Sequence, residues 1–164
     1  MASEFTLAQR MDRGAVVSGN EALALAILPS GRRLILANFI KFKASLSHSN
    51  SKVPILGRRN KTNRRGQGEI SVEATAHYNC STFREIELEH KKNGSDYTFD
   101  LQIINNDPGS SVGRQVVILY GVSWDEIPLA MFDAEADYIT EDLSGTADDW
   151  DMENVFNENG LKQA

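Results

Sequence analysis

The sequence predicts a mainly β, antiparallel protein with one flanking α-helix, arranged as a sandwich or a partly closed barrel. From Glu69 to Tyr78, apolar and polar residues alternate without a break, which is typical of a half-buried strand. Several other short segments alternate in the same way between turn-forming residues, and only residues 82–92 carry the signals of a helix. Many short strands with one helix favour an antiparallel sheet architecture.

The composition is that of an ordinary globular domain. The chain has 164 residues, of which 41% are hydrophobic and 24% are charged, so we expect one domain over residues 1–164. No apolar run approaches the roughly 20 residues that span a bilayer, and the first residues lack the pattern of a signal peptide. A single cysteine, Cys80, excludes an internal disulfide and favours a reducing compartment.

The N-terminal part of the chain predicts an arm followed by a hairpin. Residues 1–17 have weak periodicity and are expected to form an arm or a flexible end. Two apolar runs, 22–28 and 34–36, flank a Pro-Ser-Gly turn and therefore predict a β-hairpin. A short helix over residues 21–28 is the alternative, because alanine and leucine favour helices.

The next segment predicts a strand that is interrupted and then resumes. Residues 38–46 alternate, the polar run 47–52 breaks the pattern, and residues 53–56 resume it around Pro54, which indicates an edge or a bulge. The alternation places Ile40, Phe42, Ala44 and Leu46 on one face, with Lys41, Lys43 and Ser45 on the other.

The central strand and the helix are the clearest elements. In the strand 69–78 the apolar face holds Ile70, Val72, Ala74, Ala76 and Tyr78, and the polar face holds Glu69, Ser71, Glu73, Thr75 and His77. Lys41 and Lys43 would lie across from this polar face in a paired strand. For residues 82–92, Ser81 is placed to cap the helix start, and basic residues before Gly94 are placed to end it.

The C-terminal half predicts more strands. Residues 97–104 alternate, 105–113 have the composition of a loop, and 115–122 form a strongly apolar strand. Weaker strand signals cover 124–131 and 138–147, and the end, 155–164, is expected to be frayed.

Residues 56–68 predict a long projecting loop between two paired strands. This segment has no apolar side chain after Leu56, so it must be solvated or must dock on another surface. Hairpin loops usually take about two to five residues, and longer ones are usually functional or disordered. The loop residues that we single out are Gly57, Arg58, Arg59, Lys61, Arg64, Arg65, Gly66 and Gly68.

A separate acidic region lies near the C-terminus. Between Asp133 and Glu153 the chain has nine carboxylates and no lysine or arginine. A basic projection and a separate acidic region can be complementary in copies of one chain, although two solvated faces that never meet are the alternative. The candidate acidic partner surface consists of Asp133, Glu135, Asp137, Glu141 and Asp142.

No catalytic, cofactor or metal site is predicted. The three histidines fall in different predicted elements, and a buried structural thiol is more common than a nucleophile at a position such as Cys80. Two functional classes remain: a structural protein that assembles with itself, and a nucleic-acid-binding module that uses the loop Arg58–Arg65. The acidic pI near 5.1 and the lack of aromatic residues in the loop count against the second class.

An ordered set of segments resembles a known family. Its first half consists of Ser-Gly-x-Glu at 18–21, a hairpin, Ile55 to Arg59, Gly66-Gln67-Gly68 before an alternating strand, and Ser81-Thr82-Phe83 opening a helix. Its second half consists of Tyr97-Thr98-Phe99, the loop 107–113, Val116 to Gly121 and an acidic β-segment to about Glu153. The set resembles the XkdM-like tail tube proteins of contractile-tailed phages and phage-like elements, with departures in residues 1–17 and in a longer turn at 27–33.

The resemblance implies an orthogonal β-sandwich with one flanking helix and a structural, non-enzymatic role without cofactors. It implies that six copies form a ring, that rings stack into the inner tube of a virion tail, and that DNA passes through without specific binding. The implied partners are further copies of the chain, the tail sheath, the tape measure, the baseplate and the tail terminator, with no membrane. Assembly would take place in the cytoplasm of a bacterial host.

The resemblance also implies roles for two of the surfaces above. The loop 56–68 would make contacts between rings. The polar face formed by Glu69, Ser71, Glu73, Thr75, Lys41 and Lys43 would line the lumen, where carboxylates repel phosphates and let DNA slide.

Overall fold

The computed structural model describes residues 13–157, and this part of the chain forms two compact units. The first unit contains residues up to Ala37, residues 100–119 and residues from Trp150 onward. The second contains residues 38–99 and 120–149. Strand β6 (Arg114–Glu126) runs through both, so it contributes its first half to one unit and its second half to the other.

The first unit is built on the predicted N-terminal hairpin. Strands β1 (Ala22–Ile27) and β2 (Arg33–Ile35) pair antiparallel, which confirms the hairpin over the helical alternative. The turn between them contains Gly31 at φ 82°, a conformation that favours glycine. On its other side β1 pairs with β5 (Phe99–Asn106), where Ala26 lies opposite Leu101 and both are fully buried.

Both ends of the described chain are hydrogen bonded within this first unit. A short 3-10 helix, η2 (Arg13–Ala15), accepts a hydrogen bond from Ser111 N at Gly14 O, and Ala15 is buried. At the other end, Asn157 donates through its backbone to Val112 O and through its side chain to Ser111 O. The arm expected over residues 1–17 and the frayed end expected over residues 155–164 stay predictions, and residues 1–12 and 158–164 lie outside the described part.

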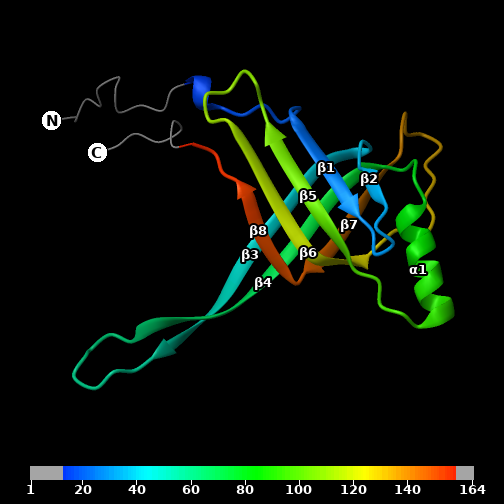
Figure 1. Cartoon of the computed structure of the whole chain (residues 1–164). Helices are drawn as coiled ribbons and strands as arrows, with labels where there is room; N and C mark the ends of the chain where they lie inside the picture. The colour runs from blue at the N-terminus through cyan, green and yellow to red at the C-terminus, as the bar shows by residue number, and fades with distance from the viewer. Residues whose placement is uncertain (1–12, 158–164) are drawn as a thin grey trace. The chain divides into compact units, whose positions relative to one another are not determined.

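The second unit contains the long strands. Strand β4 (Thr62–His77) pairs with the edge strand β3 (Phe39–Val53) on one side and with β7 (Thr140–Ala147) on the other. Figure 1 shows β3 and β4 as the longest ribbon of the molecule, extending away from the helix. The predicted burial of β4 is confirmed, because Ile70, Val72, Ala74 and Ala76 are buried and Glu69, Ser71 and Glu73 are exposed.

The beginning of β3 differs from the predicted alternation. Phe39 pairs with Ala76 while Lys41 pairs with Thr75, so Ile40 is an extra residue in a β-bulge. The bulge puts Phe39 in line with Phe42, and their rings stack with centroids 6.5 Å apart. Ile40, which was predicted to share this face, is instead 47% exposed.

Helix α1 (Thr82–Asn93) lies in the second unit, where residues 82–92 predicted it. Phe83 packs with Phe99 and Trp124, with ring centroids 5.3 to 5.8 Å apart. Gly94 ends the helix at φ 66°, and its N–H bonds to His90 O. Ser81 occupies the N-cap position but its hydroxyl makes no capping bond, because its ψ of 4° departs from the extended conformation that aims such a side chain.

The strands follow the order β2-β1-β5-β6-β7-β4-β3, and β8 (Asp149–Asn154) pairs with β6 off this path. The fold is therefore mainly β and antiparallel, with one α-helix in the described residues and a sheet that is not closed. The strand predicted over 124–131 ends at Glu126, and Pro128, which lacks a backbone donor, follows. The described residues contain no helix that is long and apolar enough to cross a membrane.

Candidate functional site

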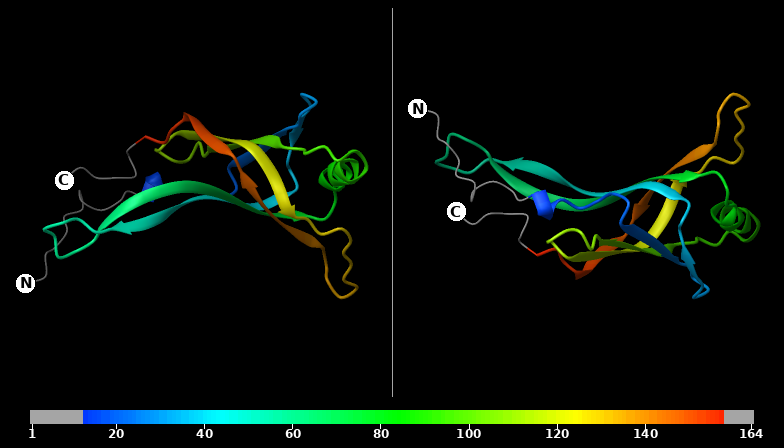
Figure 2. Two further views of the ribbon diagram at one scale, coloured as in Figure 1. Left: turned by 90° about the horizontal axis from the view of Figure 1, so that it is seen from below. Right: turned by 90° about the horizontal axis from the view of Figure 1, so that it is seen from above.

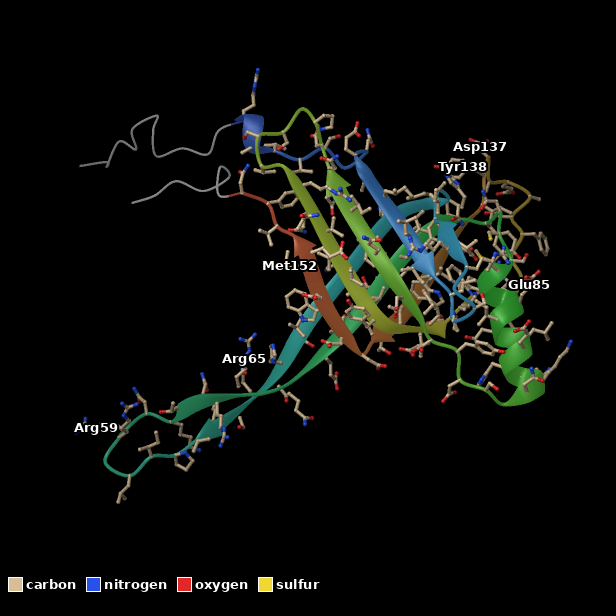
Figure 3. The ribbon with its side chains drawn as sticks, in the orientation of Figure 1. Arg59, Arg65, Glu85, Asp137, Tyr138 and Met152 are labelled. Atoms are coloured by element: carbon tan, nitrogen blue, oxygen red, sulfur yellow. The ribbon has the colours of Figure 1, made fainter. Side chains whose placement is uncertain are left out.

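The predicted loop 56–68 is mostly the end of a β-hairpin. The ladder between β3 and β4 continues through Lys52 opposite Asn63 to Val53 opposite Thr62, so only residues 54–61 lie outside the strands. The prediction that residues 47–52 interrupt the strand is wrong for the same reason. Figure 3 shows Arg59 near the end of this hairpin and Arg65 on its paired part.

A tight turn shapes the end of the hairpin. Arg58 N donates to Ile55 O over 3.2 Å, and Gly57 between them adopts φ 85°. The Arg58 guanidinium reaches Thr62 Oγ1 at 3.5 Å. This turn leaves the side chain of Leu56 fully exposed at the end of the hairpin.

Gly66 lies in a second bulge rather than in a loop. Gly66 and Gln67 together oppose Ser49, because Arg65 pairs with Asn50 and Gly68 pairs with His48. A Cβ at Gly66 would come within 2.2 Å of Ser49 O, so the close approach of two backbones requires glycine here. The ring of His48 contacts the same turn of backbone, with Nδ1 3.2 Å from Gly66 O.

The polar face of β4 is part of a wider polar surface. The registers align Lys41 with Thr75 and Asp142, and Lys43 with Glu73 and Ser144. Thr75 Oγ1 donates to Asp142 Oδ1 over 2.8 Å. The expected position of Lys41 and Lys43 across from β4 is confirmed, and the surface holds both cations and carboxylates.

The predicted acidic partner surface separates into two parts. Asp133, Glu135 and Asp137 are exposed on the connection between β6 and β7. Asp142 is exposed on the polar face described above. Glu141 is only 4% exposed and is paired within the chain, so it is not available to a partner and its assignment to this surface is wrong.

Glu141 is paired with Arg84 of helix α1. The Arg84 guanidinium donates to Glu141 Oε2, to Pro128 O over 2.8 Å and to Cys80 O over 2.6 Å. Its central carbon also lies 4.4 Å from the centre of the Tyr78 ring. Arg84 therefore joins the helix to both ends of the connection between β6 and β7.

The environment of Glu141 changes its acidity. Burial raises the pKa of Glu141 above its ordinary value of 4.5, because desolvation of the carboxylate outweighs the opposing charge and hydrogen bond of Arg84. The pair is structural: its atoms point into the protein, and no group of three or more metal-ligating side chains occurs among residues 13–157.

Comparisons with known proteins agree with this architecture. The model of the family described as phage tail tube protein matches residues 9–154. An uncharacterised protein of Bacillus subtilis strain 168, YqbM, is 30% identical over 117 residues, which cover 71% of this chain and 80% of YqbM. The XkdM protein of the phage-like element PBSX in the same strain is 29% identical over the same shares of both chains.

Solved structures show the same fold at low sequence identity. A chain of the anti-feeding prophage tube-terminating cap has a TM-score of 0.65 at 10% identity, covering 94% of this chain and 100% of that one. A chain of the PVC contractile injection system sheath/tube terminator has a TM-score of 0.64 at 10% identity, covering 85% and 97%. A chain from the tail of an empty gene transfer agent particle, with C6 symmetry, has a TM-score of 0.52 at 12% identity, covering 87% and 99%.

Proposed function

The chain belongs to the phage tail tube protein family, and we propose that six copies form a ring and that rings stack into the hollow inner tube of a tail. Proteins of this family are structural and not enzymes. The observation that carries the proposal is the open sheet, whose strand order ends at β2 and at the 15-residue strand β3. An unpaired strand edge is a template for another chain, and closing copies into a ring removes such edges.

The six-fold ring has support from a related fold. The gene transfer agent tail whose chain resembles this one was solved with C6 symmetry. Closed cyclic symmetry is also the usual solution when one face of a subunit joins a different face of the next. In this ring, β3 of each copy pairs with a neighbouring copy.

The polar face of β3, β4 and β7 lines the lumen in this proposal. Glu69, Glu73 and Asp142 give it carboxylates that repel phosphates, and Lys41 and Lys43 reduce that repulsion. The predicted lumen residues Glu69, Ser71, Glu73, Thr75, Lys41 and Lys43 include no aromatic side chain on which nucleobases could stack. DNA therefore passes through the tube without being held.

The proposed partners are those of a tail. The resembling chains come from assemblies described as a sheath/tube terminator, a baseplate and a tube-terminating cap. By analogy, this chain contacts a sheath, a tape measure, a baseplate and a terminator, and it assembles in a bacterial cytoplasm before the tail is complete.

Electron microscopy of native particles tests the proposal. We expect tails whose inner wall is formed by stacked six-fold rings of this chain, and the same tubes from purified protein at high concentration. Isolated subunits are expected to stay monomeric at low concentration until a baseplate initiates growth. Native particles that carry the chain only outside a hollow tube would contradict the proposal.

The five exposed cations of the hairpin keep a nucleic-acid-binding module as the second candidate function. A DNA-binding hairpin would give an affinity that falls steeply with salt. We expect no appreciable duplex binding at physiological salt. Tight binding that is lost on replacing Arg58, Arg59, Arg64 and Arg65 by alanine, but kept on replacing the exposed Lys91 and Lys92 of α1, would favour the module.

A further inference from the structure

The second unit carries two complementary surfaces at opposite ends of β4. We define the basic tip as residues 53–65 and the acidic segment as residues 128–138. The basic tip surrounds the start of β4 at Thr62, and the acidic segment precedes the strand β7 whose Thr140 pairs with His77 at the end of β4. At about 3.3 Å per residue, the 16 residues of β4 separate these ends by roughly 50 Å. Figure 2 shows the hairpin and the connection before β7 at opposite ends of the second unit in both views.

The basic tip combines positive charge with one apolar side chain at its end. It contains four arginines, Lys61 and no carboxylate, and every one of these five cations is exposed. Leu56 is fully exposed, and the neighbouring Ile55 is 44% exposed. An exposed leucine at the end of a projecting hairpin is suited to enter a contact with another surface.

The acidic segment has the opposite charge and a matching apolar character. It contains Asp133, Glu135 and Asp137 and no cation, and all three carboxylates are exposed. Leu129 is 77% exposed and Phe132 is 91% exposed. Figure 3 shows Asp137 and Tyr138 at the end of the unit opposite Arg59.

The acidic segment is held in place before any partner arrives. Arg84 binds Pro128 O at its beginning and Glu141 just after its end. Tyr78 N donates to Ile139 O over 3.0 Å, and the Tyr138 ring meets His77 edge-on at 5.9 Å. A segment fixed at both ends loses less conformational entropy when it binds.

We propose that the basic tip of one copy docks on the acidic segment of a second copy, with Leu56 packed against Leu129 and Phe132 and the arginines paired with Asp133, Glu135 and Asp137. The proposal rests on the proposed function and names the surface that receives the hairpin between successive rings. The two surfaces differ and lie at opposite ends of one unit, so the contact is heterologous, and it builds an open stack when its repetition does not close on itself. Tip-to-tip pairing would place like charges together and is disfavoured.

Charge reversal tests the contact with the apolar residues intact. Arg58→Glu with Arg59→Glu, and separately Asp133→Lys with Asp137→Lys, should each raise the protein concentration needed for tube growth at least about tenfold. Combining all four substitutions in one chain should restore growth. The matched control reverses Lys91 and Lys92 on α1 and should leave growth unchanged.

Disulfide cross-linking tests the geometry. In a Cys80→Ser background, Leu56→Cys with Phe132→Cys should give a ladder of covalent multimers in assembled tubes, because two cysteines form a disulfide only when their Cα atoms are within about 7 Å. Leu56→Cys with Leu88→Cys is the control, since Leu88 is also an exposed leucine but lies on α1. That pair should give no ladder.

The outcomes separate this contact from the tube itself. The docking would be overturned by normal tubes from both charge-reversal variants, or by a combined variant that does not restore growth. In either case, stacked rings of the unmodified protein would still support the proposed function. If the cysteine variants do not assemble, the charge-reversal series alone decides. Absence of rings and tubes from the unmodified protein and from native tails would overturn the proposed function instead.

Discussion

Replacing Arg84 by methionine should destabilise the second unit more than any surface substitution. Methionine keeps an unbranched apolar side chain of similar length but removes the charge and every hydrogen bond of the guanidinium. Arg84 is 15% exposed and Glu141 is 4% exposed, so the pair is shielded from water and is not an ordinary surface ion pair.

The size of the effect follows from the contacts. Removing one partner of a buried pair costs about 3–5 kcal/mol, because the remaining charge is left without compensation. Glu141 can escape part of this cost by taking up a proton, since its pKa is already raised. The bonds to Pro128 O and Cys80 O and the contact with the Tyr78 ring are lost as well. We therefore expect Arg84→Met to lower the free energy of unfolding by about 3–5 kcal/mol.

A double-mutant cycle separates the pair from its surroundings. Arg84→Met, Glu141→Leu and the combined variant are compared by urea unfolding, followed by the fluorescence of tryptophan, because Trp124 packs against Phe83 of α1. Two neutral apolar residues leave no buried charge, so the combined variant should be more stable than the sum of the single effects predicts by about 1–3 kcal/mol. A loss below about 1 kcal/mol for Arg84→Met, or strictly additive effects, would refute the reasoning.

Three further predictions follow from other sites. Because the pKa of folded Glu141 is raised, the stability that this group contributes is present below pH 4.5 and is lost as the pH rises through the folded pKa. The free energy of unfolding of the unmodified protein minus that of Glu141→Gln should therefore fall as the pH rises, and a difference that rises with pH would contradict this reasoning. Gly66→Ala should speed amide hydrogen exchange in the hairpin, because its Cβ would meet Ser49 O at 2.2 Å. Gly19→Ala should leave that exchange unchanged, because nothing lies within 4 Å of its Cβ, and equal protection in both variants would show that the bulge tolerates a side chain. Arg58→Ala with Arg59→Ala should leave thermal unfolding unchanged, since both side chains are exposed, and should block tube growth in electron micrographs. Normal tubes would show that these arginines are not needed for assembly, and a misfolded monomer would show that they stabilise the subunit instead.

The sequence predicted strands best where one face is buried. The alternation from Glu69 to Tyr78 predicted both the strand and its buried face, and the expected position of Lys41 and Lys43 across from its polar face is confirmed by the register. Residues 62–68 belong to the same strand, but both faces of the hairpin are exposed to solvent there, so neither face carries the apolar side chains that mark a buried face. Without that contrast, a paired strand and a solvated loop have the same polar sequence, so the loop boundary was wrong.

The sequence pattern around Glu141 indicated that its side chain is buried, but its charge led us to place it on the surface. Glu141 is in phase with Leu143 and Ala147, which are buried, so strand alternation alone would have turned it inward. Its partner Arg84 is 57 residues away along the chain, and no local pattern joins the two. The bulge at Ile40 was similarly hidden, because an extra residue becomes visible only when the pairing of the two strands is known.

The proposed contact between copies also gives a reason to expect that subunits remain separate until a ring exists. Each exposed ion pair contributes about 0–1 kcal/mol, and each of the side chains of Leu56, Leu129 and Phe132 that the contact buries contributes about 1.5–3 kcal/mol. Association of two free molecules costs an estimated 4–15 kcal/mol in translational and rotational freedom, which is of the same size, so we expect a single tip on a single acidic segment to hold two subunits together only weakly. In the proposed six-fold ring, six acidic segments would be presented at once, and a subunit that joins it would also pair its strand edge with a neighbour, so both contacts would share a single association cost. Growth is therefore expected to start from a preformed ring, and a baseplate that supplies one would remove the slow first step.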